Sequence, residues 1–138
     1  MTFDPARPRY TLPFAGKEYD LLGTFELIEA VETALKLEIT KAAVDVVREM
    51  TAHDLAKLVS AVLTASGTPL TAKEAGAALW NEIGLAGDDN TLLRLHLYAF
   101  LTICLAKPGR RAEKAKEMGE LIGELRAASR GATTSASA

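Results

Sequence analysis

Residues 9–35 read RYTLPFAGKEYDLLGTFELIEAVETAL, and this stretch decides the fold class. Its first half alternates apolar and polar residues around a glycine, which is typical of a β-hairpin, and its second half has apolar residues at helical spacing. We expect a two-residue type II′ turn at Gly16 and Lys17. The cross-strand pairs of that register, which share one face, are Phe14 with Tyr19 and Leu12 with Leu21. A lone hairpin is marginally stable, so this face should pack on the first helix.

The rest of the chain reads as helices with recognisable start and stop residues. Thr24 is an N-cap candidate, residues 38–50 favour a helix despite their β-branched valines, and residues 71–74 form a capping box, Thr-Ala-Lys-Glu. The fold class is therefore mostly α: a multi-helix domain with a short N-terminal β-hairpin. We further expect a helix to start at Thr51, helices to end at Gly67 and Gly84, and a cap at Asp88, Asp89 and Asn90. Each helix should also have an apolar stripe that faces the core. The expected stripes are Phe25, Ile28, Val31 and Leu35 in the first helix, Leu55, Leu58, Val59 and Val62 in the helix that starts at Thr51, and Ala75, Ala78, Leu79 and Ile83 in the helix that starts at Thr71.

The length of 138 residues is that of a single domain with its own core. Charge is unevenly distributed: residues 1–106 hold 9 Lys or Arg against 14 Asp or Glu, whereas residues 107–138 hold 7 against 4. We divide the chain into an N-terminal arm (1–8), the hairpin plus helical domain (9–106), a charged C-terminal helix (107–130) and a disordered tail (131–138). The charged helix has a thin apolar seam, which indicates loose docking or docking to another molecule; its members are Ala115, Met118, Ile122 and Leu125.

Residues 91–106, TLLRLHLYAFLTICLA, are apolar nearly all round. Sixteen residues rise only about 24 Å and include Arg94 and His96, so this helix does not read as a membrane span. It is either a central buried helix or one whose second apolar face contacts another subunit, and we favour the subunit contact because a small helical domain rarely encloses one helix completely. The candidate protein-interaction residues on this helix are Leu97, Tyr98, Phe100 and Leu101.

No residue pattern points to catalysis, a cofactor or a metal. Glu26, Glu29 and Glu32 share one side of a helix but lack a second ligand set such as Glu-x-x-His, so a solvated face explains them better. His53 should be exposed and His96 should be a hydrogen-bonded buried histidine. The expected packing residues are Cys104, which has no basic neighbour in sequence, and Trp80, which is more often core than an interface anchor.

Partners other than protein find little support. The net charge of −2 gives no electrostatic argument for nucleic acid or an anionic membrane. Residues 71–97 could be read as helix-turn-helix, but the recognition helix would open with two aspartates and offer only Arg94 as a cation. The N-terminus has no apolar signal core, so we expect a cytoplasmic protein.

The hairpin followed by GTFELIEAVE and capped, alanine-rich helices resembles the tail assembly chaperones of long-tailed phages and gene transfer agents. Residues 14–21 (FAGKEYDL) and 25–29 (FELIE) carry most of the resemblance, with 54–56 (DLA) and the stretch from Thr71 to Gly84. The resemblance covers residues 9–106. It implies a non-catalytic protein that binds the tape measure protein, keeps it soluble and helps to recruit tail tube protein in the host cell cytoplasm.

Two other interpretations stay open. One is a structural tail component, such as a tube or terminator subunit, although those are usually dominated by β-sheet and this chain has few strands. The other is a generic bacterial helical protein-interaction domain. In each case the surplus apolar helix surface predicts a homo-oligomer when no partner is present.

Overall fold

A computed structural model describes residues 4–137, with side chains up to residue 128. It confirms the predicted class, mostly α with an N-terminal β-hairpin. The elements in chain order are β1 (Arg9–Phe14), β2 (Lys17–Leu22), α1 (Phe25–Leu35), α2 (Ile39–Arg48), α3 (Ala52–Ala65), α4 (Ala72–Ala78), the π-helical turn η1 (Leu79–Ile83), α5 (Asp88–Leu105), the 3₁₀ turn η2 (Pro108–Arg110) and α6 (Arg111–Ser137).

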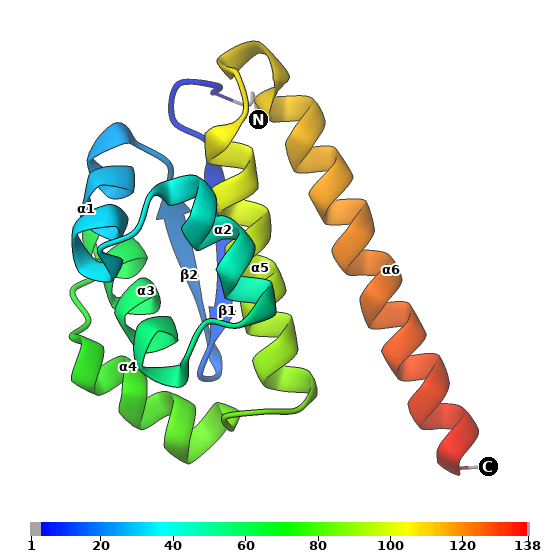
Figure 1. The fold of residues 1–138 in the computed structure, drawn as a ribbon. Coiled ribbons are helices and arrows are strands. Elements are labelled where there is room, and N and C mark those ends of the chain that lie inside the picture. Colours follow the sequence, from blue (N-terminus) through cyan, green and yellow to red (C-terminus); the bar gives the residue numbers. More distant parts are fainter. Residues whose placement is uncertain (1–3, 138) are drawn as a thin grey trace.

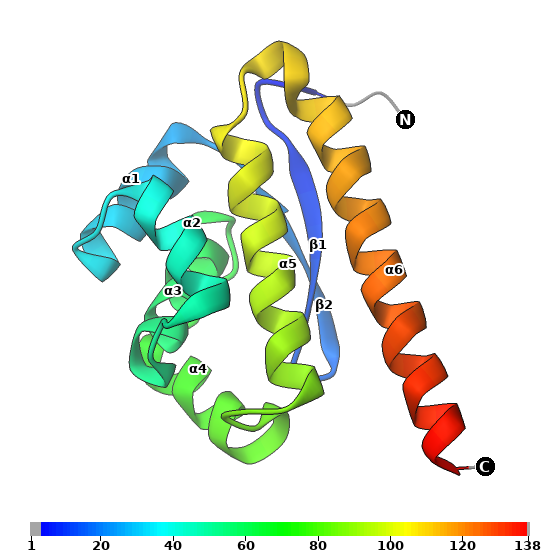
Figure 2. The same ribbon diagram turned by 45° about the vertical axis from the view of Figure 1, so that its right-hand side comes forward.

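Helix α5 stands at the centre of the arrangement (Figure 1). It packs against α2, the strand β1, the turn η1 and α6, while α3 joins α1, α4 and β2 on the other side of the core. The hairpin therefore packs on α5 and α3, and the expectation that it packs on the first helix is wrong. Turned by 45°, the molecule shows the hairpin running alongside α5 (Figure 2). Leu22 N–H donates to Ser66 Oγ at 3.0 Å and so ties β2 to the end of α3.

The predicted hairpin is present, but its turn begins one residue earlier than predicted, which shifts the strand register by two residues. The observed loop is Ala15-Gly16, and Leu12 lies opposite Tyr19. Ala15 (φ 52°) and Gly16 (φ 80°) both have positive φ, which is the type I′ conformation that matches the twist of the flanking strands. This register pairs all six residues of each strand and leaves Thr24 beyond the sheet to begin α1.

The predicted inward face of the hairpin is nevertheless correct, because the register is shifted by two residues and side chains alternate. Leu12, Phe14 and Leu21 are buried. The rings of Phe14 and Tyr19 still meet diagonally across the strands, with centroids 6.4 Å apart.

Local capping signals fix the helix starts as predicted. Thr24, Thr51 and Thr71 each accept a backbone N–H with the side-chain hydroxyl, at 3.0–3.1 Å. Thr71 and Glu74 complete the capping box, since Thr71 N–H donates to Glu74 Oε1 at 3.0 Å. The predicted cap of α5 is wrong: its N-cap is Gly87, without a side-chain cap bond. The predicted stripe of α1 is also shifted, because Leu27 is buried and Phe25 is exposed.

Arg94 and Asn90 make a long-range polar link between α5 and α2. Arg94 Nη1 donates to the carbonyls of Val46 (3.0 Å) and Met50 (2.9 Å), which belong to the last turn of α2 and the residues after it. Asn90 orients this guanidinium by accepting from Arg94 Nε at 2.8 Å and donates to the Gly84 carbonyl at 2.9 Å. This one cation therefore caps α2 and joins it to α5.

Helix α6 extends to Ser137, through most of the expected tail at 131–138. Ala138 lies outside the described residues, as do residues 1–3 of the predicted N-terminal arm. The remaining arm residues are held to the body: Gly23 N–H donates to the Pro8 carbonyl at 2.7 Å, and Arg111 Nη1 donates to the Pro5 carbonyl.

The turn predicts a simple stability experiment. Ala15→Asn should raise the free energy of unfolding by about 0.5–1 kcal/mol, because asparagine tolerates positive φ better than alanine. Gly16→Ala should lower it by about 1 kcal/mol, since a Cβ there meets nothing within 4 Å and only the backbone conformation is penalised. Urea denaturation measures both. Equal stability of the two variants would contradict the type I′ assignment.

Candidate protein-interaction site

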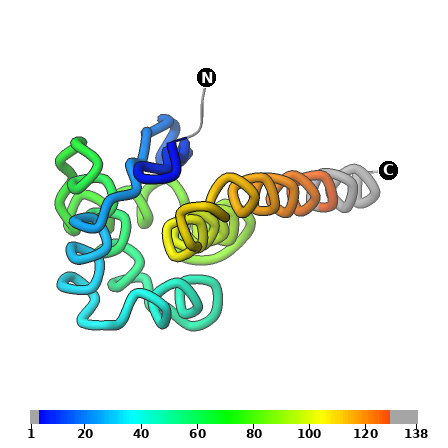
Figure 3. Tube along the Cα trace, turned by 90° about the horizontal axis from the view of Figure 1, so that it is seen from above, coloured from blue at the N-terminus to red at the C-terminus, as the bar shows by residue number. Residues whose placement is uncertain are grey.

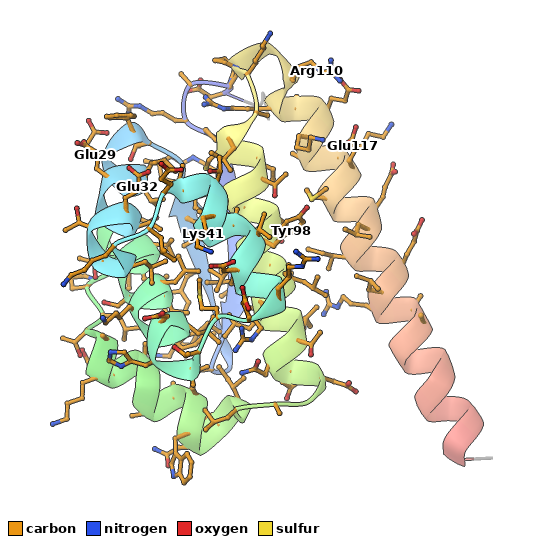
Figure 4. The ribbon with its side chains drawn as sticks, in the orientation of Figure 1. Glu29, Glu32, Lys41, Tyr98, Arg110 and Glu117 are labelled. Carbon is orange, nitrogen blue, oxygen red and sulfur yellow. The ribbon has the colours of Figure 1, made fainter. Side chains whose placement is uncertain are left out.

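The structure places the predicted interaction residues of α5 mostly inside the core. Leu97, Phe100 and Leu101 are fully buried, and Tyr98, which Figure 4 labels on α5, is half-buried. The prediction that these residues form an exposed wall is therefore wrong for the first three. The alternative, a central buried helix, describes α5 better, because α2, β1 and α6 cover it within one chain.

Helix α6 is attached to the body along α5. Seen from above, it extends away from the other helices, with α5 between it and them (Figure 3). Ala99 and Ile103 of α5 and Ile122 of α6 are buried, yet they do not belong to the contiguous core of the domain. Among residues 111–128 of α6, Ile122 is the one buried side chain, so the contact of the arm with the body is narrow. Its exposed side carries short-range ion pairs near Arg110 and Glu117 (Figure 4), namely Arg110 with Glu113 and Lys114 with Glu117.

A groove lies between the N-terminal half of α5 and the middle of α6. We call it the α5–α6 groove; it encloses a cavity of about 420 Å³ and is lined by Asp88, Asp89, Thr91, Leu92, Leu95, Leu125 and Arg126. Leu92 and Leu95 are half-buried, and Leu125 is 40% exposed. Two aspartates lie on the α5 side and one arginine on the α6 side. The groove is an apolar trough with oppositely charged rims.

His96 of α5 is hydrogen-bonded to the hairpin. Its Nδ1 is 2.6 Å from the hydroxyl of Tyr10, and the ring is 7% exposed, which confirms the predicted hydrogen-bonded buried histidine. Its Nε2 is buried and has no hydrogen-bond partner among residues 4–128. Burial lowers the pKa of His96, with a further lowering by the Arg126 guanidinium. Burial also raises the pKa of Tyr10 to about 12, so this pair is neutral near pH 7.

Cys104 and the glutamates of α1 are the other candidate side chains. Burial raises the pKa of the Cys104 thiol to about 11 in spite of Arg111, a basic neighbour that the sequence order did not reveal. Glu32 accepts the N–H of Ile39 at 3.0 Å and so caps α2, whereas Glu26 and Glu29 are exposed. Figure 4 shows Glu32 on the side of α1 that faces the start of α2. Within the described residues, His, Cys, Asp and Glu side chains form no group of three that could hold a metal ion.

Two aromatic residues that should be buried lie on the surface. Trp80 is 73% exposed, so the prediction of a core tryptophan is wrong, and Phe25 is exposed to the same extent. Helical phase explains Trp80: Ala75 and Leu79 face the core, and Trp80 follows about 100° further round the helix. His53 is exposed, as predicted.

None of the helices in the described part of the chain combines the length and apolar character needed to cross a membrane. Comparison with family models, with curated proteins and with solved structures found no match for this chain. Its function therefore has to be argued from the sequence and from the surfaces described above.

The His96 environment predicts a pH dependence of stability. Because the pKa is lowered in the folded protein, the unfolded chain binds more protons below about pH 6.5, and stability falls as the pH drops from there toward the folded-state pKa. His96→Gln should reduce this loss. Urea denaturation from about pH 5 to about pH 7.5 measures it, with exposed His53→Gln as the control. An unchanged pH profile in His96→Gln would contradict the assignment.

Proposed function

We propose that this chain is a non-catalytic assembly chaperone for the tails of long-tailed phages or gene transfer agents. In this proposal it binds amphipathic helices of the tape measure protein in the α5–α6 groove. The observation that carries the proposal is the groove itself, in which Leu92, Leu95 and Leu125 border a volume that the described residues leave unfilled. Binding of an amphipathic helix in an apolar groove is a common mode of recognition.

The arrangement of α6 supports a binding role for this surface. A helix that packs mainly on α5, and whose described side chains are not part of the contiguous core, can adjust its distance from α5 at little cost to that core. The opposite charges of Asp88 and Arg126 on the two rims would favour one direction of the bound helix. The same charges lie above an apolar floor, which suits helices rather than extended polar peptides.

The biological setting rests on the resemblance of residues 9–106 to tail assembly chaperones. In that setting the tape measure protein is the main partner, tail tube protein is recruited to the complex, and the work takes place in the host cell cytoplasm. Self-association without a partner is part of the same proposal. Neither nucleic acid nor membrane is a proposed partner, and neither metal nor cofactor is required.

Two leucines of equal exposure provide the test. Leu125→Glu places a charge in the groove and should weaken binding of a tape measure fragment by about thirtyfold, because a charge in an apolar contact costs about 2 kcal/mol. Leu105→Glu is the matched control, since Leu105 is also 40% exposed but lines a different cavity, near Phe25 and Cys104. Calorimetric titration measures affinity, and co-expression measures how much fragment stays soluble.

The proposal requires that Leu105→Glu behaves as the wild type and that both variants keep the far-ultraviolet circular dichroism of the wild type. Equal binding by both variants would place the partner on another surface. A wild type that neither binds the fragment nor keeps it soluble would end the chaperone assignment.

A further inference from the structure

A pocket opens where the turn of the hairpin meets the start of α5, next to the α5–α6 groove. Its volume is about 520 Å³, within the usual range of ligand sites, and we call it the hairpin pocket. Its apolar lining includes Phe14, Ile83, Leu92 and Leu93, and its charged or polar lining consists of Lys17, Glu18, Glu82, Asp89 and His96. Asp89 and Leu92 also line the α5–α6 groove, so the two hollows adjoin.

Three carboxylates reach the hairpin pocket from three different elements. Glu18 belongs to β2, Glu82 to η1 and Asp89 to α5, and all three side chains are exposed. Within residues 4–128, none of the ion pairs of the structure includes any of them. Lys17 is the one cation among the residues that line the pocket, so negative charge outweighs positive charge there. This balance favours a cationic ligand.

His96 gives a second and independent reason to expect a ligand. Its ring is 7% exposed and borders the pocket, yet its Nε2 has no hydrogen-bond partner among residues 4–128. A buried polar atom without a partner has lost its hydration and gained nothing in return, so native structures rarely keep one. The ring is neutral near pH 7, because burial lowers the pKa of His96. When Nδ1–H donates to the Tyr10 hydroxyl, the lone pair lies on Nε2 and can accept an N–H of the ligand.

The spacing of the acidic groups selects the kind of cation. A metal ion needs ligands that converge on one point, and within the described residues no three His, Cys, Asp or Glu side chains do so. The carboxylates are therefore distributed around the pocket. A guanidinium suits this arrangement better than an ammonium, because its five N–H donors lie in a planar fork and can reach several acceptors at once. The methylenes of an arginine would cover the apolar lining.

We propose that the hairpin pocket binds an arginine side chain of a partner protein, with the guanidinium held by the three carboxylates and by His96. The identity of that partner rests on the proposed function, since a helix in the α5–α6 groove would carry its arginine into the adjoining pocket. Arg126 of this chain lines the groove and not the pocket, so it does not fill the site.

A blocked arginine tests the pocket without any tape measure sequence. N-acetyl-L-arginine methylamide, titrated into the full chain, should shift the backbone amide signals of Gly16, Lys17 and Asp89 in proton–nitrogen NMR spectra. The nitrogen signal of His96 Nε2 should move as well, which an effect confined to the exposed carboxylates would not produce. N-acetyl-L-citrulline methylamide has nearly the same shape without the charge, and it should bind about tenfold more weakly or worse.

Two variants of the pocket should change the affinity in opposite directions. The double variant Glu18→Gln/Glu82→Gln should weaken binding of the blocked arginine by about tenfold, because it removes two of the paired charges. Lys17→Gln should strengthen binding by about twofold, because it removes the like charge. The matched control is Glu26→Gln/Glu29→Gln, which removes two exposed carboxylates that line a different cavity, and its affinity should equal that of the wild type.

Three results would overturn the proposal. They are equal binding of the citrulline and arginine probes, an equal loss of affinity in the control and the pocket double variants, and free L-arginine binding more than about tenfold tighter than the blocked form, which would indicate a site for the free amino acid. A wild type that binds the blocked arginine but no tape measure fragment would support the pocket and refute the chaperone assignment.

Discussion

The structure depends on the enclosure of α5, an 18-residue helix that is apolar on nearly every side. Such a helix must be covered all round, and the chain does this with α2 on one side, the hairpin on another and α6 on a third. Polar residues of α5 lie where these elements contact it. Arg94 donates to a carbonyl at the end of α2, and His96 is hydrogen-bonded to Tyr10 of the hairpin. The position of each outer element is therefore set by its contact with α5.

The three elements that cover α5 differ in how firmly they are attached to it. Residues of the hairpin and of α2 join α5 in one contiguous core, whereas Ile122, the one buried residue of α6 within 111–128, lies outside it. Helix α6 also contains Gly119 and Gly123, each of which lowers helix stability by about 1 kcal/mol and meets no neighbouring atom that would require a glycine. The arm is thus only weakly held to the core. A groove bordered by such an arm can open for a partner helix while the core stays intact.

Features that depend on neighbouring residues could be predicted from the sequence. Thr24, Thr51 and the capping box at Thr71 work through bonds within one helical turn, and the inward face of the hairpin follows from simple alternation. Features that depend on distant residues could not be predicted from the sequence. The partners of Arg94 lie more than forty residues away, and only the fold reveals that Arg111 approaches Cys104.

The predicted interaction site failed for a related reason. An all-round apolar helix has the same sequence whether the second covering comes from another subunit or from the chain's own α6. The burial of Trp80 was predicted wrongly, although the stripe Ala75, Ala78, Leu79 and Ile83 had already left it out of the inward face. The helical periodicity was therefore a better guide than the usual burial of tryptophan.

Native-state hydrogen exchange tests the central claim, that α5 is enclosed by a stable core and a weakly held arm. Amides around Leu97 should exchange only through global unfolding, while those around Ile122 should exchange through a local opening of much lower free energy. Equal opening free energies for the two helices would contradict the account.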